Sequence, residues 1–200
     1  MKNTKRVIQK ALALVFAVGV LVSPSVVRAA TASANTTINA TIASVISIST
    51  SGTVAIAITP IAGGSQTSAS DTVTVSTNNA AGYDLTLANS DATLTLVNGA
   101  NTIGAHAGTY AAPTALANNT WGYAVGGLGS FDASYTTLTN ATTSTTKWSG
   151  VPSSASPQNI KSTATVASGD TTTVWYAVKA DTTKPNGVYT DTVTYTATTK

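Results

Sequence analysis

The sequence predicts an all-β protein: an antiparallel β-sandwich of jelly-roll or Greek-key type, with about nine or ten strands after an N-terminal signal helix. Three observations lead to this fold class. Short segments alternate apolar and polar residues along most of the chain, turn residues separate these segments, and the composition opposes helix. Only 8% of the residues are charged and Glu is absent, whereas Thr, which favours strands, is abundant.

The first 29 residues have the parts of a secretory signal peptide. A basic start is followed by the apolar residues 11–22 and by small residues at −3 and −1 of a cut after Ala29. A cut after Ala32 is the alternative. The apolar run of 12 residues is too short to span a bilayer comfortably. We therefore expect a secreted protein at the extracellular cell surface, with no membrane contact after cleavage and with residues 30–200 as a single β-sandwich domain.

Cleavage reverses the sign of the net charge. The precursor has a formal charge of +3, but residues 30–200 keep five Lys against seven Asp, a formal charge of −2. No basic patch remains that would bind nucleic acid. The chain also has no Cys, so it cannot use disulfides. A mature chain of roughly 170 residues can bury enough surface to fold without them.

The first half of the mature chain contains most of the short alternating segments. The expected strands are 37–49, 53–59, 71–77, 83–88 and 92–97. In the first of them Ile38, Ile42, Ile46 and Ile48 share one side. Residues 62–70 are expected to be a flexible connection, and Asn98-Gly99 signals a tight turn.

The second half is less regular. The expected strands are 120–125, 163–168, 171–180 and 188–198, with a turn at 184–187. Between them we expect a loop at 126–131 and a polar loop or weak edge strand at 139–146. Trp148, Val151 and Ile160 are expected to anchor an otherwise coiled connection.

Threonine occupies nearly all of one side of the last expected strand. The same pattern recurs in the segments 71–77, 92–97 and 171–173. Threonine combines high strand propensity with cross-strand contacts, and its contacts do not depend on pH or salt. We interpret these positions as the solvent face of a sheet that avoids charge.

No catalytic or metal-binding motif is present, and we predict neither an enzyme nor a cofactor. His106 is the only histidine, and its surroundings suit a loop histidine better than a catalytic one. The Asp residues at strand ends are expected to serve as turn residues and edge protection. These are Asp84, Asp91, Asp170, Asp181 and Asp191. An internal Lys–Asn or Lys–Asp cross-link through Lys179 is a further alternative.

Four aromatic residues are the candidate ligand-binding residues: Trp121, Tyr123, Trp175 and Tyr176. Exposed flat rings can stack on sugars, but large aromatics at alternating strand positions are more often part of the core. Trp175 and Tyr176 are adjacent and so point to opposite faces. Either one of them lies outside the local core, or both faces of that strand are covered.

Three stretches resemble secreted bacterial surface β-sandwich proteins: STNNAAGYDLTL (76–87), TWGYAV (120–125) and KADTTKPNGVYTDTVTYTAT (179–198). The last is similar to the final hairpin of spore-coat-U and fimbrial-type domains. GYDLTL and VWYA resemble the two tryptophan motifs of wall-binding WxL domains, with Tyr83 in place of Trp and Ala177 in place of Leu. The resemblance implies a surface β-sandwich in contact with cell-wall polymer or other surface proteins.

These observations favour a non-catalytic structural or adhesive surface subunit, such as a coat, fimbria-like or wall-associated protein, with self-association as one option. The alternative is a carbohydrate- or peptidoglycan-binding module that uses the exposed aromatics. The isoleucine segment 38–48 allows two interpretations. It is either the first strand of its own domain, which the frequency of closed domains favours, or a strand donated to a neighbouring subunit.

Overall fold

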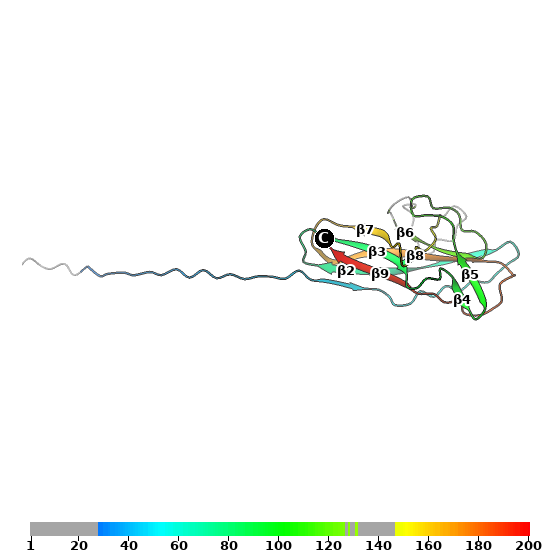
Figure 1. Ribbon diagram of the computed structural model, residues 1–200, viewed down its shortest axis with the longest axis horizontal. Coiled ribbons are helices and arrows are strands. Elements are labelled where there is room, and N and C mark those ends of the chain that lie inside the picture. Colours follow the sequence, from blue (N-terminus) through cyan, green and yellow to red (C-terminus); the bar gives the residue numbers. More distant parts are fainter. Residues whose placement is uncertain (1–27, 127, 129–130, 132–146) are drawn as a thin grey trace, which may run out of the picture. The chain divides into compact units, whose positions relative to one another are not determined.

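The structure, a computed structural model, describes residues 28–126, 128, 131 and 147–200. These residues contain no helix, and their nine strands form two sheets (Figure 1). Nearly all of the expected signal peptide and the expected loop 139–146 lie outside the described residues. The chain divides into two units, residues 1–41 and 42–200. Residues 28–41 are exposed and contain no strand, so every described strand belongs to the second unit.

The larger sheet has six strands in the order β1-β2-β8-β6-β5-β4. Their bounds are β1 Ile46–Ser49, β2 Ser65–Thr77, β8 Ala167–Ala180, β6 Thr120–Val125, β5 Asn101–Ala105 and β4 Leu96–Asn98. All neighbours are antiparallel except β5 and β6, which are parallel. The longest pairing in this sheet is between β2 and β8. It extends from the pair Ser65–Ala180 to the pair Thr77–Ala167.

The smaller sheet has three antiparallel strands in the order β7-β3-β9. Their bounds are β7 Gln158–Ser162, β3 Tyr83–Asn89 and β9 Val193–Thr199. Strand β3 is central, and its apolar residues Tyr83, Leu85 and Leu87 are fully buried. The alternation that predicted this strand therefore identifies its core face correctly.

The two sheets share one hydrophobic core. Val73 and Val75 of the large sheet and Leu85 and Leu87 of the small sheet all have no exposed surface. A hydrogen bond of 2.6 Å between the hydroxyl groups of Tyr176 and Tyr195 also joins the two sheets. The predicted all-β class with mainly antiparallel pairing is confirmed.

Two expectations for the N-terminal part of the second unit are wrong. Residues 62–70 are not a flexible connection, because Ser65–Ser70 form the first half of β2 and pair with β8. The segment 53–59 is not a strand. Its alternate residues Val54, Ile56 and Ile58 pack half-buried against the core without a hydrogen-bonded ladder. The first half of β2 was missed because its residues are nearly all polar. The segment 53–59 was predicted as a strand because it alternates, but it has no neighbouring strand to pair with.

The expected strand 163–168 is wrong, because only its last two residues lie in a strand, β8, and the observed strand β7 falls earlier, in the expected coiled connection. Three further expected strands are shorter than predicted. Of the segment 188–198, only the part from Val193 onward lies in β9. Of the segment 37–49, only Ile46–Ser49 pairs with β2. Of the segment 92–97, only the end forms β4. Residues 99–100, which overlap the predicted Asn98-Gly99 turn, connect β4 to β5. Gly99 has a φ of 61°, the left-handed conformation that such turns require.

Candidate functional site

The four candidate aromatic residues are all buried. Their exposed fractions are 4% for Trp121, 1% for Tyr123, 2% for Trp175 and 5% for Tyr176. The Trp121 indole donates a hydrogen bond of 3.1 Å to the Leu94 carbonyl, and its ring stacks on Tyr176 at a centroid distance of 6.4 Å. A sugar needs an open ring face, which none of the four offers. The exposure on which the carbohydrate-binding alternative depends is therefore absent at these residues.

Both faces of β8 are covered, which resolves the question that Trp175 and Tyr176 raised. The register places Tyr176 opposite Tyr123, and Trp175 opposite Ala124. Because the Tyr176 hydroxyl reaches Tyr195 of β9, this face points toward the small sheet. Trp175 points to the other face and is buried there as well. Burial raises the pKa of the Tyr176 hydroxyl well above its ordinary value, so the group stays neutral.

His106 is a buried histidine with both ring nitrogens engaged. The Ala117 N–H donates to Nδ1 over 3.4 Å, which leaves Nε2 protonated and able to donate to the Thr114 hydroxyl over 2.9 Å. Burial lowers the pKa of His106 below its ordinary value, and hydrogen bonding with Thr114 opposes this shift in part. A general base needs a free nitrogen within reach of a nucleophile. These contacts hold the ring in place, and the same side chain lines an open hollow.

Three glycines allow the chain to pack closely around His106. A Cβ at Gly150 would lie 2.0 Å from the His106 carbonyl oxygen, and one at Gly122 would lie 2.4 Å from the Ser149 carbonyl oxygen. A Cβ at Gly108 would meet the Trp148 carbonyl oxygen at 2.4 Å. An open hollow of about 280 Å³ lies here, with His106, Tyr123 and Ser149 among its lining residues. The Ser149 hydroxyl donates to the Gly150 carbonyl over 3.0 Å rather than to a histidine nitrogen.

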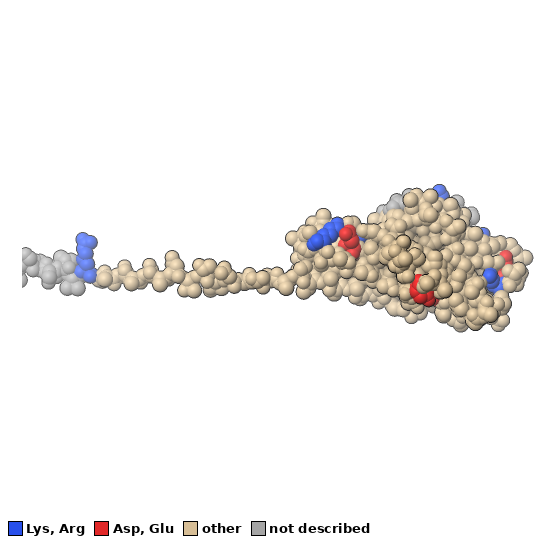
Figure 2. Space-filling model, viewed as in Figure 1, with Lys and Arg blue, Asp and Glu red and all other residues tan. Residues whose placement is uncertain are grey.

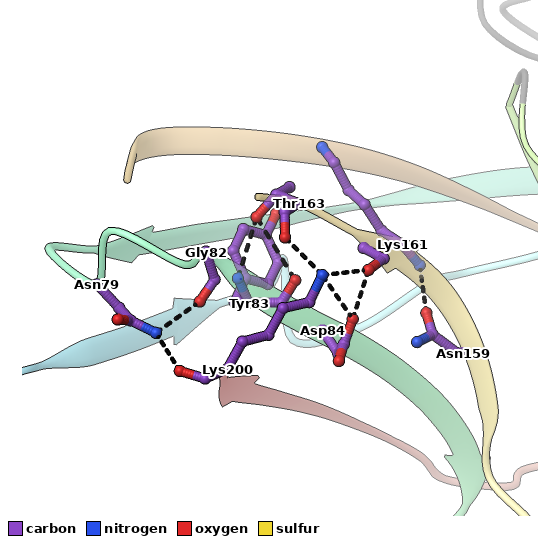
Figure 3. A network of polar contacts seen from close by, with 9 residues as sticks. Asn79, Gly82, Tyr83, Asp84, Asn159, Lys161, Thr163 and Lys200 are labelled. Atoms are coloured by element: carbon purple, nitrogen blue, oxygen red, sulfur yellow. Dashed lines mark hydrogen bonds and ion pairs between the residues drawn. The ribbon is translucent and has the colours of Figure 1, made fainter. Parts of the chain in front are cut away.

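A polar network ties the end of β9 to β3 and β7 (Figure 3). The Lys200 ammonium donates to the Ser162 hydroxyl and to the Thr163 carbonyl, each over 2.6 Å, and lies 3.5 Å from Asp84. Asn79 donates to the carbonyl oxygens of Gly82 and Lys200. The Ser162 hydroxyl, followed by the Lys200 charge, lowers the pKa of Asp84. The network fixes the end of β9.

A second ion pair joins the two sheets near the same end. Lys161 of β7 lies 2.6 Å from the Asp170 carboxylate of β8, which also accepts the Tyr83 hydroxyl over 2.8 Å. Burial opposes ionisation of Asp170, but its bonds from Lys161 and Tyr83 outweigh burial and lower its pKa. Sequence analysis placed Asp170 at a strand end but did not single out Lys161, since their contact joins separate elements. The Lys161 ammonium also donates to the Thr171 carbonyl over 3.0 Å, so this side chain contacts β8 at two positions.

The surface carries few charges and several exposed apolar side chains. Figure 2 shows one face, on which charged side chains are few. Ile38 is 90% exposed and Ile42 is 84% exposed. Isolated apolar residues are common on protein surfaces, but two large aliphatic side chains this exposed, on the same side of an extended segment, suggest a contact surface. This exposed apolar segment, residues 36–44, is the best candidate for a functional site.

Two classes of site are not represented in the parts of the chain that the structure covers. Residues 28–126, 128, 131 and 147–200 contain no group of three or more His, Asp or Glu residues able to hold a metal ion. The same residues contain no helix of the length and hydropathy needed to cross a membrane.

Comparisons with protein-family models, with curated proteins and with solved structures found no match to this chain. The resemblance to WxL, spore-coat-U and fimbrial-type proteins stays a prediction from its short motifs.

Proposed function

We propose that this protein is a secreted, non-catalytic structural or adhesive subunit of a bacterial cell surface, a coat, fimbria-like or wall-associated protein. The observation that carries the proposal is the exposed apolar segment, in which Ile38 and Ile42 are almost fully solvent-exposed. Large aliphatic side chains this exposed favour a surface that a partner covers. The partner is another surface protein, a second copy of this chain, or cell-wall polymer.

The composition of the surface supports a structural role. A sheet surface of Thr, with few charges, keeps its contacts when pH or salt outside the cell changes. The shared core of two sheets supports an antiparallel sandwich of jelly-roll or Greek-key type, which needs no disulfide to persist outside the cell.

Binding to wall polymer and self-assembly can be separated in one experiment. The chain from residue 30 is incubated with purified cell-wall polymer and with whole cells, and the same sample is imaged by negative-stain microscopy. We expect fibres, sheets or other ordered assemblies, or retention by whole cells. Retention by bare polymer without assemblies would instead favour the carbohydrate- or peptidoglycan-binding alternative. The absence of both retention and assembly would overturn the proposal.

A further inference from the structure

Two Asn-Gly pairs, Asn98-Gly99 and Asn186-Gly187, lie at turns of the fold, and no other Asn in the sequence precedes a Gly. Asn is a thermally labile residue, and a following Gly leaves its backbone nitrogen open to the Asn side-chain amide because Gly has no side chain. Asn98 ends β4, and Asn186 lies in the connection between β8 and β9. The two pairs share one chemistry, deamidation, and their surroundings decide which of them reacts.

Asn186 is placed to react. Asn186 and Gly187 are exposed, and among the described residues neither the Asn186 side-chain amide nor the Gly187 N–H has a hydrogen-bond partner. Gly187 has a φ of 147°, a conformation that residues with a side chain rarely adopt. The attacking nitrogen and the amide carbon that it attacks therefore both belong to exposed, unpaired groups.

Asn98 is restrained at both its backbone and its side chain. It is half-buried, and its backbone pairs with Asn101 in the ladder between β4 and β5. Its Nδ2 donates a hydrogen bond of 3.5 Å to the Asn186 carbonyl, and a Cβ on Gly187 would lie only 2.0 Å from this Nδ2. The Asn98 amide therefore packs directly on the Gly187 backbone. The reaction at Asn98 requires this contact and the end of the ladder to open first.

The same contact couples the two pairs. The connection that contains Asn186 is held against β4 by backbone hydrogen bonds of 2.9 and 3.0 Å between Val97 and Thr190. When Asn186 becomes isoaspartate, the backbone runs through the former side chain and is longer by one atom. The carbonyl that Asn98 contacts then becomes a free carboxylate outside the backbone. Deamidation of Asn186 therefore removes the restraint on the Asn98 side chain.

We propose that Asn186 is a site of spontaneous deamidation, and that its conversion opens Asn98 as a second, slower site. The Gly187 nitrogen attacks Cγ of Asn186, and the new C–N bond closes a five-membered imide. The side-chain nitrogen leaves as ammonia with the proton of the Gly187 N–H. Water then adds to one of the two imide carbonyls and opens the ring to aspartate or isoaspartate. Water is the only co-reactant.

The inference goes beyond the proposed function and does not depend on it. Each converted site adds a charge of −1 to the formal −2 of residues 30–200, so that both sites together give −4. Nothing in the reaction restores Asn. The fraction of converted Asn186 therefore records the age of the chain outside the cell.

Peptide mapping by mass spectrometry tests the order of the two sites. The chain from residue 30 is held at mildly alkaline pH, which favours the backbone nitrogen as nucleophile. We expect Asn186 to convert at least about tenfold faster than Asn98, because Asn98 must first lose hydrogen bonds. A synthetic peptide of residues 182–191 supplies the rate of an unstructured Asn-Gly pair. Equal rates, faster conversion of Asn98, or an Asn186 that stays intact while the peptide converts would each overturn the assignment.

The replacement Asn186→Gln tests the coupling. Gln keeps the amide but must close a six-membered ring, which is much slower, and the exposed position should leave the fold unchanged. In this variant Asn98 should convert slowly throughout, whereas in the parent its conversion should become about tenfold faster once Asn186 has reacted. The matched control Asn98→Gln should convert Asn186 no more slowly than the parent does. An Asn98 rate that is the same in the parent and in Asn186→Gln would reject the coupling.

Hydrogen exchange locates the structural change. Once Asn186 has converted, the amides of Val97 and Thr190 should exchange about tenfold faster, with the amides of β3 as the internal reference. Unchanged protection at these two amides would contradict the release of Asn98. None of these measurements requires assembly or retention by cells, so the proposed function and the deamidation site can fail separately.

Discussion

Strands β8 and β9 are similar in sequence but differ in burial. Both alternate threonine with apolar residues. In β8 the five consecutive residues from Val174 to Val178 are buried, whereas β9 alternates between half-buried and exposed residues. Strand β8 lies between β2 and β6 in the large sheet, and β9 is an edge of the small one. Position within the sheet, rather than the alternating pattern, decides whether the polar side of a strand meets solvent.

The largest expected difference between the two strands concerns their aromatic side chains. Trp175→Ala should lower the free energy of unfolding by about 3–5 kcal/mol, because it leaves a cavity at a position that is 2% exposed. Tyr195→Ala, at a half-buried position of β9, should lose about half as much. Urea unfolding followed by circular dichroism measures both. Equal losses of stability would show that β9, at the edge of the small sheet, is packed as tightly as β8 inside the large sheet.

Glycine substitutions test how closely the chain packs beside β6. Gly122→Ala should lower the free energy of unfolding by about 1–3 kcal/mol, because its Cβ would lie 2.4 Å from the Ser149 carbonyl oxygen. Gly104→Ala in β5 is the matched control, since no atom lies within 4 Å of its Cβ. The control should stay within about 0.5 kcal/mol of the parent. Two equally mild effects in thermal unfolding would contradict the close approach.

The loss of stability on mild acidification should come from His106, which lies beside β6 in the large sheet, rather than from β9. The folded state lowers the pKa of His106, so below the unfolded value of about 6.5 the unfolded chain binds more protons. Stability contributed by neutral His106 is therefore complete above that pH and is lost as the pH falls toward the folded pKa.

The replacement His106→Gln checks this assignment. The variant should be less stable at pH 7, yet its free energy of unfolding should change less between pH 6.5 and about 5, above the main titration of the carboxylates. Urea unfolding at several pH values measures the slope. An unchanged slope would assign the acid sensitivity to another group.

The sequence predicted those elements whose signal is local. The strand at 120–125 is observed with the same bounds, and Tyr83, Leu85 and Leu87 occupy the predicted core face. Trp148, Val151 and Ile160 are buried, as expected of anchors, but Ile160 lies in strand β7 and not in a coiled connection. Alternation and turn chemistry act between near neighbours in the chain, so they can be recognised without knowing the fold.

Features that depend on distant partners could not be predicted. Residues 65–70 are mostly polar and look like a linker, but they form a strand because β8 is long enough to pair with them. The covered second face of β8, which buries Trp175, likewise depends on the rest of the chain. The exposed apolar segment was recognised as a strand pattern, and its two interpretations could not be separated because pairing is a property of the sheet.

The smallest expected effects concern threonine itself and differ in size between the two strands. Thr172 of β8 is 5% exposed, and its hydroxyl has no hydrogen-bond partner among the described residues. Thr172→Val should therefore raise the free energy of unfolding by about 1 kcal/mol, because it removes an unsatisfied buried group and keeps the shape. Thr196→Val on the exposed side of β9 should change it by less than about 0.5 kcal/mol. Thermal unfolding of the two variants measures the difference. A loss of stability in Thr172→Val would mean that its hydroxyl is satisfied in solution, and the threonine of the buried strand would then be as well accommodated as that of the edge.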